Sequence, residues 1–206
     1  MRRIAVVVHA EAQHHVDRLV GGWFDSSLTE RGRKQARQVG LALRGVFPQP
    51  HVPIVSSDLL RARETADIVG DVLGSSVAME PGLRELSYGV AEGQPKAWLD
   101  EQIAPTPAHG PRLDHHICEG AESRRDIATR VYAAMNRILT SDQRDLVIVA
   151  HGFAVTFVMA CWIGLPIESV GYVTFAASPA GISLLVEDDV FRNRIVSRLN
   201  DTRHLD

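Results

Sequence analysis

The stretch Val147-Ile148-Val149-Ala150-His151-Gly152 places a histidine directly after a buried, β-type run, and an apolar helical run follows the glycine. The same arrangement occurs near the amino terminus, where Val6-Val7-Val8 precedes His9. In an open α/β sheet, ligands bind beyond the carboxyl ends of the strands. Two histidines delivered to that edge from distant parts of the chain therefore predict one shared site.

Apolar periodicity elsewhere alternates between strands and helices. We expect strands at residues 4–8, 52–56, 77–79, 145–150, 172–175, 182–187 and 195–199. Helices are expected to begin near residues 30, 58, 122 and 153. Strands that alternate with helices of this length predict an α/β fold, a three-layer sandwich with a mainly parallel central sheet. We expect one domain over residues 1–206.

Residues 89–120 depart from this alternation. The segment contains four prolines and little apolar periodicity. A connection of this length in a compact domain is usually functional. We therefore expect a lid-like insertion over the site, and substrate specificity to lie there.

Composition excludes several classes of protein. The net charge of −3 over 206 residues offers no general attraction for nucleic acid. No run is long and apolar enough for a membrane span, and the amino terminus lacks a signal-peptide pattern. Cys118 and Cys161 lack metal spacing, and no histidine pair has the spacing of a helical metal site. We expect a cytoplasmic protein without a metal, acting on a small molecule as a monomer or a homodimer.

Five short segments carry a resemblance to a known family. They are His9 with Glu11, residues 25–32, residues 56–66, residues 83–89 and residues 150–152. In this order and spacing, they resemble the histidine phosphatase superfamily, the phosphoglycerate-mutase-like proteins. The resemblance covers nearly the whole chain and implies a phosphoglycerate-mutase-like fold, phosphoryl transfer through a phosphohistidine, and no cofactor.

The resemblance also implies roles for individual residues. His9 would be the nucleophile, Glu85 the proton donor to the leaving oxygen, and Arg61 and His151 phosphate ligands. A neutral imidazole is a competent nucleophile near neutral pH, and the transferred phosphoryl group needs positive or N–H-donating groups around it. Glu11, His15 and Arg84 are the further residues that we expect to bind the substrate.

The first motif departs from the family pattern. The family has Arg-His-Gly, an acid or amide, a hydroxyl residue and, three positions later, Asn. This chain has Val8-His9-Ala10-Glu11-Ala12, with His15 in place of the Asn. An arginine fork makes two charge-assisted hydrogen bonds, so its absence weakens phosphate binding unless another group substitutes. The candidates to substitute are His14, His15, Arg18, Arg63 and Arg84.

Three hypotheses about function follow. The first is a phosphatase for a small phosphomonoester, which the short middle segment favours over a mutase. The second is an enzyme that uses His9, Glu85 and His151 for acid–base chemistry on a substrate without phosphate. The third is a catalytically inactive pseudo-phosphatase.

Overall fold

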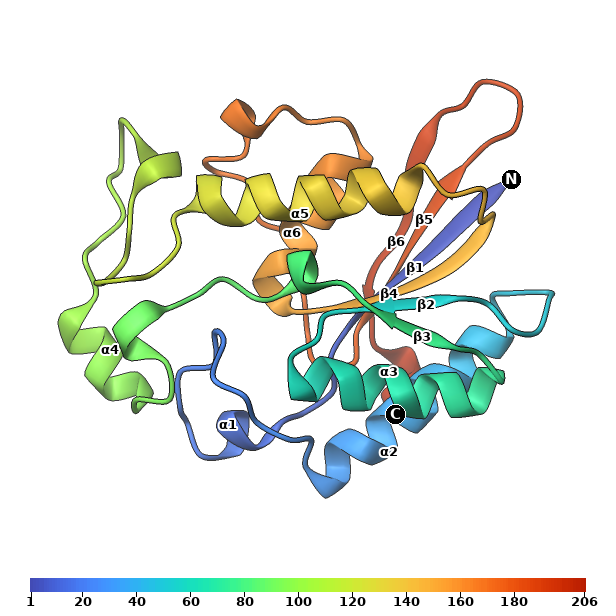
Figure 1. The fold of residues 1–206 in the computed structure, drawn as a ribbon, viewed down its shortest axis with the longest axis horizontal. Helices are drawn as coiled ribbons and strands as arrows, with labels where there is room; N and C mark the ends of the chain where they lie inside the picture. The colour runs from blue at the N-terminus through green and yellow to red at the C-terminus, as the bar shows by residue number, and fades with distance from the viewer.

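A six-stranded sheet with helices on both faces forms the centre of the protein (Figure 1), whose computed structural model describes all of residues 1–206. The strands are β1 (Arg2–Val8), β2 (Ile54–Ser56), β3 (Val77–Met79), β4 (Asp145–Ala150), β5 (Ile182–Glu187) and β6 (Arg194–Asp201). Their order is β3-β2-β4-β1-β5-β6. The first four in this order are parallel, and β5 and β6 are antiparallel to their neighbours. The predicted α/β sandwich with a mainly parallel sheet is confirmed.

The helices form the two outer layers of the sandwich. They are α1 (Gln13–Val16), α2 (Glu30–Arg44), α3 (Leu60–Leu73), α4 (Lys96–Gln102), α5 (Arg124–Leu139) and α6 (Gly152–Trp162). In Figure 1, α2 and α3 cover one face of the sheet and α5 and α6 cover the other, while α1 and α4 lie beyond the sheet on the left. The 3₁₀ turns are η1 (Pro81–Leu83), η2 (Gly89–Ala91), η3 (Arg112–Asp114), η4 (Ile167–Ser169) and η5 (Arg203–Leu205).

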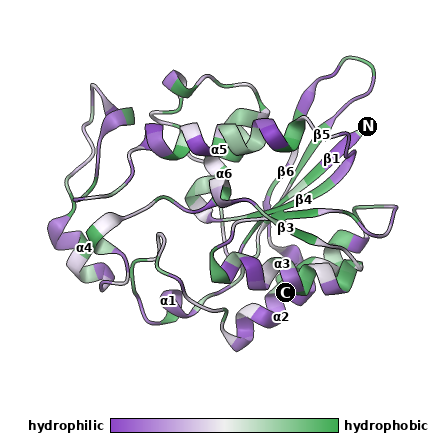
Figure 2. Cartoon of the chain, in the orientation of Figure 1, coloured by the Kyte–Doolittle hydropathy of each residue, from purple (hydrophilic) through white to green (hydrophobic).

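The apolar side chains of β1 supply both halves of the core because successive residues of a strand point to opposite faces. Ile4, Val6 and Val8 pack with α5 and α6, whereas Ala5 and Val7 pack with α2 and α3. Figure 2 shows hydrophobic strands between helices that carry both hydrophilic and hydrophobic residues. The register of β1 with β4 aligns Val8 with Ala150, so the two histidines that follow leave the sheet side by side.

The first turn of α3 is held by a residue that is distant in sequence. Asp25 accepts a hydrogen bond from the backbone N–H of Leu60 at 2.6 Å through its Oδ1 atom, and the residue at the N-cap is Leu59. A carboxylate at a helix amino terminus satisfies an unpaired N–H and complements the helix dipole. This contact fixes the start of the helix that carries Arg61.

One predicted strand is wrong. Residues 172–175 form irregular chain, not a strand. The Arg124 guanidinium donates to the carbonyl oxygens of Val170 and Val173, and the N–H of Phe175 donates to Thr156 Oγ1. These side chains take hydrogen bonds that a sheet neighbour would otherwise supply.

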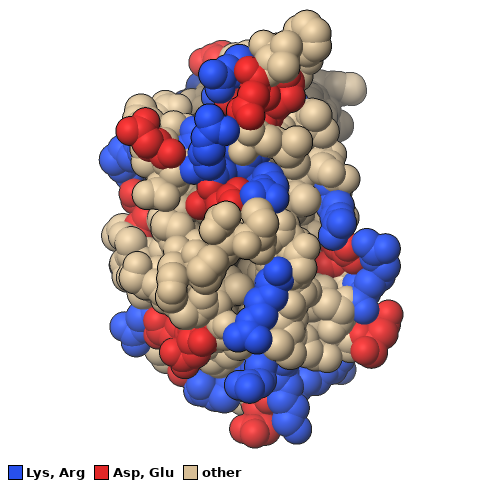
Figure 3. Space-filling model, turned by 90° about the vertical axis from the view of Figure 1, so that its right-hand side faces the viewer, with Lys and Arg blue, Asp and Glu red and all other residues tan.

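The surface carries charges of both signs. Figure 3 shows the side of the molecule at the right of Figure 1, where Lys and Arg lie close to Asp and Glu. This mixture accords with the small net charge of −3. None of the helices is both long and apolar enough to span a membrane.

Candidate active site

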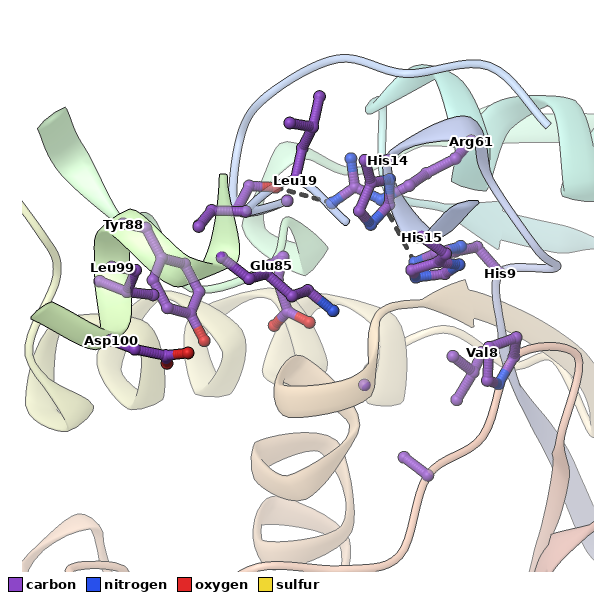
Figure 4. A pocket seen from close by; sticks show the side chains of 17 residues that line it. Val8, His9, His14, His15, Leu19, Arg61, Glu85, Tyr88, Leu99 and Asp100 are labelled. Atoms are coloured by element: carbon purple, nitrogen blue, oxygen red, sulfur yellow. Dashed lines mark hydrogen bonds between the residues drawn. The ribbon is translucent and has the colours of Figure 1, made fainter. Parts of the chain in front are cut away.

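A cavity of about 390 Å³ lies beyond the carboxyl ends of β1 and β4. Figure 4 shows imidazole rings at one end, Glu85 in the middle, and Tyr88, Leu99 and Asp100 at the other end. The lining residues are Val8, His9, His14, His15, Leu19, Val20, Gly21, Gly22, Arg61, Glu85, Tyr88, Lys96, Leu99, Asp100, Gly152, Ala177 and Pro179. The cavity therefore joins four of the five motif segments to part of residues 89–120.

His9 is held in one orientation by the backbone. Its N–H donates to Ala150 O at 2.9 Å, and its Nδ1 lies 2.8 Å from Ala10 O. A carbonyl oxygen only accepts, so Nδ1 carries the proton and Nε2 keeps its lone pair. Burial, and then the charge of Arg61, holds the pKa of His9 well below its ordinary value. The ring is therefore neutral, with its nucleophilic nitrogen defined.

Arg61 is the buried cation of the cavity and is only 1% exposed. Its Nε donates to His9 Nε2 at 3.2 Å. Its two terminal nitrogens donate to Phe24 O at 2.9 Å and to Gly22 O at 2.6 Å. The guanidinium thus touches the expected nucleophile, but backbone carbonyls already use part of its donor capacity.

Glu85 is bound at the amino end of α6. Its Oε2 accepts from the N–H of Phe153 and its Oε1 from the N–H of Ala154, both at 3.0 Å. The N–H of Leu86 also donates to Oε1 at 2.9 Å. Removal from water nevertheless raises the pKa of this carboxyl above its ordinary value, outweighing the backbone donors and Arg61. A carboxyl with a raised pKa suits proton donation near neutral pH.

His14 and His15 bring two further imidazoles to the His9 end of the cavity. The His15 ring stacks on His9 at 5.4 Å between centroids, and the His14 ring lies 6.1 Å from His9. Ala12 N–H donates to His15 Nδ1 at 3.2 Å, and His14 Nδ1 lies 2.6 Å from Ser26 Oγ. Burial is the main cause that lowers both pKa values, that of His14 to about 3.

Val8 occupies the cavity wall where the family pattern has arginine. Its side chain is 5% exposed and belongs to the core cluster under α5 and α6. The wall beside His9 is therefore apolar at this point, and no cation extends from the end of β1.

His151 lies behind His9 and is fully buried. The two ring centroids are 5.1 Å apart, and His151 Nε2 lies 2.8 Å from Ser57 Oγ. Its Nδ1 has no hydrogen-bond partner. The ring is outside the set of residues that line the cavity, although it contacts one that does. Burial, and then Arg61, holds its pKa well below the ordinary value.

The sequence did not predict the residues of the wall opposite the imidazole rings, which we call the far wall of the cavity. Lys96 and Asp100 are one turn apart on α4, both are exposed, and Leu99 lies between them on the same helix. Tyr88 completes this wall, and burial raises its pKa to about 12. The only signal for the wall was the unusual character of residues 89–120, because a seven-residue helix is too short for a clear apolar period.

Besides His151, two of the expected site residues do not line the cavity. Arg84 forms a bidentate pair with Asp58, with both N–O distances at 2.7 Å or less. Glu11 accepts from Thr29 Oγ1 at 2.7 Å and pairs with Arg31. Their charges are therefore used in ion pairs and hydrogen bonds outside the cavity. No group of three or more His, Cys, Asp or Glu side chains is arranged to hold a metal ion.

Comparison with known proteins agrees with the motif order. Residues 4–202 match the family model of the histidine phosphatase superfamily (branch 1). The probable phosphoglycerate mutase GpmB of Erwinia tasmaniensis is 32% identical over 175 residues, which cover 81% of this chain and 77% of the relative. The corresponding Klebsiella pneumoniae protein is 34% identical over 176 residues, with the same coverage of both chains.

Solved structures of phosphatases share the fold. A mycobacterial glucosyl-3-phosphoglycerate phosphatase, solved in complex with VO₃, superposes with a TM-score of 0.80 at 28% identity. That match covers 98% of this chain and all of the other. The α-ribazole phosphatase of Shigella flexneri has a TM-score of 0.79 at 25% identity, covering 97% of this chain and 96% of that one.

Proposed function

Because this chain belongs to the histidine phosphatase superfamily, we propose that it is a phosphatase that hydrolyses a small phosphomonoester through a phosphohistidine at His9. The orientation of His9 carries this proposal. With Nδ1–H donating to Ala10 O, the lone pair on Nε2 faces Arg61 at the cavity. A nucleophile needs this free electron pair directed at the substrate.

In the proposed first step, His9 Nε2 attacks phosphorus while Glu85 protonates the leaving oxygen. The bond from phosphorus to the alcohol oxygen breaks as the N–P bond forms, and the alcohol leaves. In the second step, the Glu85 carboxylate takes a proton from water, whose oxygen displaces His9 and releases inorganic phosphate. Arg61 turns one N–H from His9 to a phosphoryl oxygen, and His15 donates its Nε2–H.

Two observations assign supporting roles within this proposal. Backbone N–H of Ala12 donates to Nδ1 of His15, so the neutral His15 ring carries its proton on Nε2, as a donor to an anion must. His151 Nδ1 is buried without a partner, and we assign it as a donor to a phosphoryl oxygen. His151 Nε2 then accepts from Ser57. We propose that α4 closes the cavity as part of a lid formed by residues 89–120.

A second candidate function rests on Val8. The cavity lacks a cation at this position, and Arg61 is already bonded to two carbonyl oxygens. An apolar wall beside neutral imidazoles and Glu85 also suits acid–base chemistry on a substrate without phosphate. Failure of inorganic phosphate and vanadate to bind, together with binding of an uncharged metabolite, would favour this candidate.

The deciding experiment compares p-nitrophenyl phosphate hydrolysis by the wild type, His9→Gln and His51→Gln. His51 is exposed and lies before β2, outside both the cavity and the proposed lid, so its variant is the matched control. We expect His9→Gln to lose about three orders of magnitude in kcat/KM, because the covalent path is removed. We also expect an acid-labile phosphoprotein in the wild type only after substrate is added. Equal rates in all three proteins would exclude the proposal.

A further inference from the structure

The buried part of the cavity holds too little positive charge for a dianion. Arg61 is its one cation, and Glu85 adds no positive charge, because it is neutral when protonated, as the proposed first step requires, and cancels Arg61 when ionised. Lys96 and Asp100 are also of opposite sign, and both are exposed on α4. An oxyanion with two charges beside His9 therefore lacks a matching counter-charge. A buried, uncompensated charge is costly, and the usual remedy is a change in protonation.

Hydrogen bonds show which imidazole can supply that charge. A second proton on His9 Nε2 would break the bond from Arg61 Nε and remove the nucleophilic lone pair. A second proton on His15 Nδ1 would oppose the N–H of Ala12. A second proton on His151 would go to Nε2, which lies 2.8 Å from Ser57 Oγ, and neither of these residues lines the cavity.

His14 can accept a proton without losing a bond. Its Nδ1 faces Ser26 Oγ at 2.6 Å, and the hydroxyl can accept from Nδ1–H as well as donate to Nδ1. When Nδ1 carries the proton, Nε2 is free. A Cβ at Gly21 would lie 2.9 Å from this Nε2, so glycine at position 21 leaves room around the nitrogen. His14 and Gly21 both line the cavity.

The groups that face His14 keep it neutral until an anion arrives. Removal from water, His15 of α1, Arg61 of α3 and Lys96 of α4 all lower its pKa, which is about 3. His9 follows β1 and is also neutral. An opposite unit charge within about 4–6 Å raises a histidine pKa by about 1–3, and the oxyanion carries two charges. Anion binding therefore brings the His14 pKa toward neutral pH.

We propose that a tetrahedral oxyanion binds in this cavity together with one proton, which His14 takes up at Nε2, so that His14 becomes the second cation of the site. The proton comes from solvent and no covalent bond changes. The inference rests on the proposed phosphate-binding role of the cavity. It identifies the substrate as a phosphomonoester that binds with a net charge of −1 when the proton is counted.

The sign of the pH dependence follows from linkage. Between the His14 pKa in the free protein and its higher pKa in the complex, binding takes up about one proton. Affinity in that window then falls by about tenfold for each unit of rising pH. Above the pKa in the complex, this dependence ends.

The test uses inorganic sulfate, because sulfate is a tetrahedral dianion that does not titrate in this range. Calorimetric titrations at about pH 5.5 in buffers of different ionisation enthalpy give the number of protons taken up per sulfate bound. We expect about one proton for the wild type and for the control His51→Gln. We expect none for His14→Gln, with binding weakened about tenfold or more, and an intermediate loss of affinity for Ser26→Ala.

Glu85 is the rival acceptor, because its carboxyl can also take up a proton when an anion binds. Uptake that persists in His14→Gln and disappears in Glu85→Gln would overturn the assignment. If His14→Gln does not fold, the imidazole NMR signals of His14 in the wild type test the assignment instead. They must change to those of the cationic form when sulfate is added. Sulfate binding without proton uptake, or no sulfate binding at all, overturns the inference. If either result is found but hydrolysis still depends on His9, then only the inference about His14 is wrong and the proposed function is unaffected.

Discussion

Two walls of the cavity are built in different ways, and we call them the β4 wall and the β1 wall after the strands beside them. At the β4 side, Glu85 is fixed by backbone N–H groups at the amino end of α6. At the β1 side, the wall consists of Val8 and the side chains of His9, His14 and His15. The first wall agrees with the family pattern in residue type, and the second departs from it.

The two walls differ in what holds their polar groups in place. Backbone donors keep their positions as long as β4 and α6 keep their register, whatever the neighbouring side chains are. The fold does not require a charged side chain at the β1 wall. The sheet forms equally well with Val8 at this position, because Val8 packs in the core. Substitutions on the two walls should therefore have different consequences.

Replacement of Glu85 by Gln should have the largest effect. The change removes the proposed proton donor while keeping its shape, and general acid–base catalysis contributes about 10²–10⁴-fold. We expect kcat for p-nitrophenyl phosphate to fall within that range. The acid must be protonated to act, and its pKa is raised. The wild-type rate should therefore decline as pH rises through that pKa, and the decline should be absent in the variant.

The control for this variant is Glu30→Gln on α2, an exposed carboxylate whose side chain makes no hydrogen bond and which lies outside the cavity and the proposed lid. It should retain the wild-type rate and pH profile. A Glu85→Gln protein with wild-type kcat and an unchanged alkaline decline would show that the β4 wall takes no part in proton transfer.

Arg61→Met should mainly affect stability, because the Arg61 guanidinium donates hydrogen bonds to the backbone of residues 22–24. The change leaves the carbonyl oxygens of Gly22 and Phe24 without their donor. An unsatisfied buried polar group costs about 1–3 kcal/mol, so the free energy of unfolding should fall by about 2–4 kcal/mol. Urea denaturation measures this. Arg63→Met on the same helix is the control, because Arg63 is exposed. A loss in Arg61→Met no larger than the control would contradict the structural role.

Val8→Arg tests the β1 wall directly. A charge-assisted hydrogen bond contributes about 1.5–3 kcal/mol, so phosphate should bind about 10–100-fold more tightly. We expect the hydrolysis rate to rise too, and proton uptake with sulfate to diminish because the site then holds a permanent second cation. Calorimetry with inorganic phosphate measures the first effect.

Val8→Met is the matched control, since it enlarges the side chain without adding charge. If Val8→Arg binds phosphate no better than Val8→Met, then the apolar wall beside His9 is not what limits anion binding.

The sequence predicted the elements whose hydrogen bonds are local or whose apolar pattern is long. The strands at 145–150 and 182–187 are present as expected, and the helix before Gly74 ends there because this glycine adopts φ +66°. The predictions that failed concern residues whose positions depend on contacts with distant parts of the chain. Arg84 pairs with Asp58 instead of reaching the cavity, and the seven-residue α4 brings Lys96 to the cavity without a visible period.

Ser57→Ala should have the smallest effect and tests how His151 is held at the end of β4. The substitution removes the hydroxyl that lies 2.8 Å from His151 Nε2. His151 Nδ1 already lacks a partner, so the variant leaves a fully buried imidazole without a hydrogen bond. A buried polar atom that loses its partner costs about 1–3 kcal/mol, and one such atom is affected here.

The matched comparison is Ser75→Ala, because the Ser75 hydroxyl is buried with no partner at all. Removing it should leave the free energy of unfolding unchanged or slightly increased, since an unsatisfied polar atom is lost. Urea denaturation of the two variants therefore separates a hydroxyl that supports a histidine from one that does not. Equal losses in both would mean that Ser57 does not hold His151. In that case, the β4 wall depends on backbone contacts alone, and the contrast between the two walls becomes sharper.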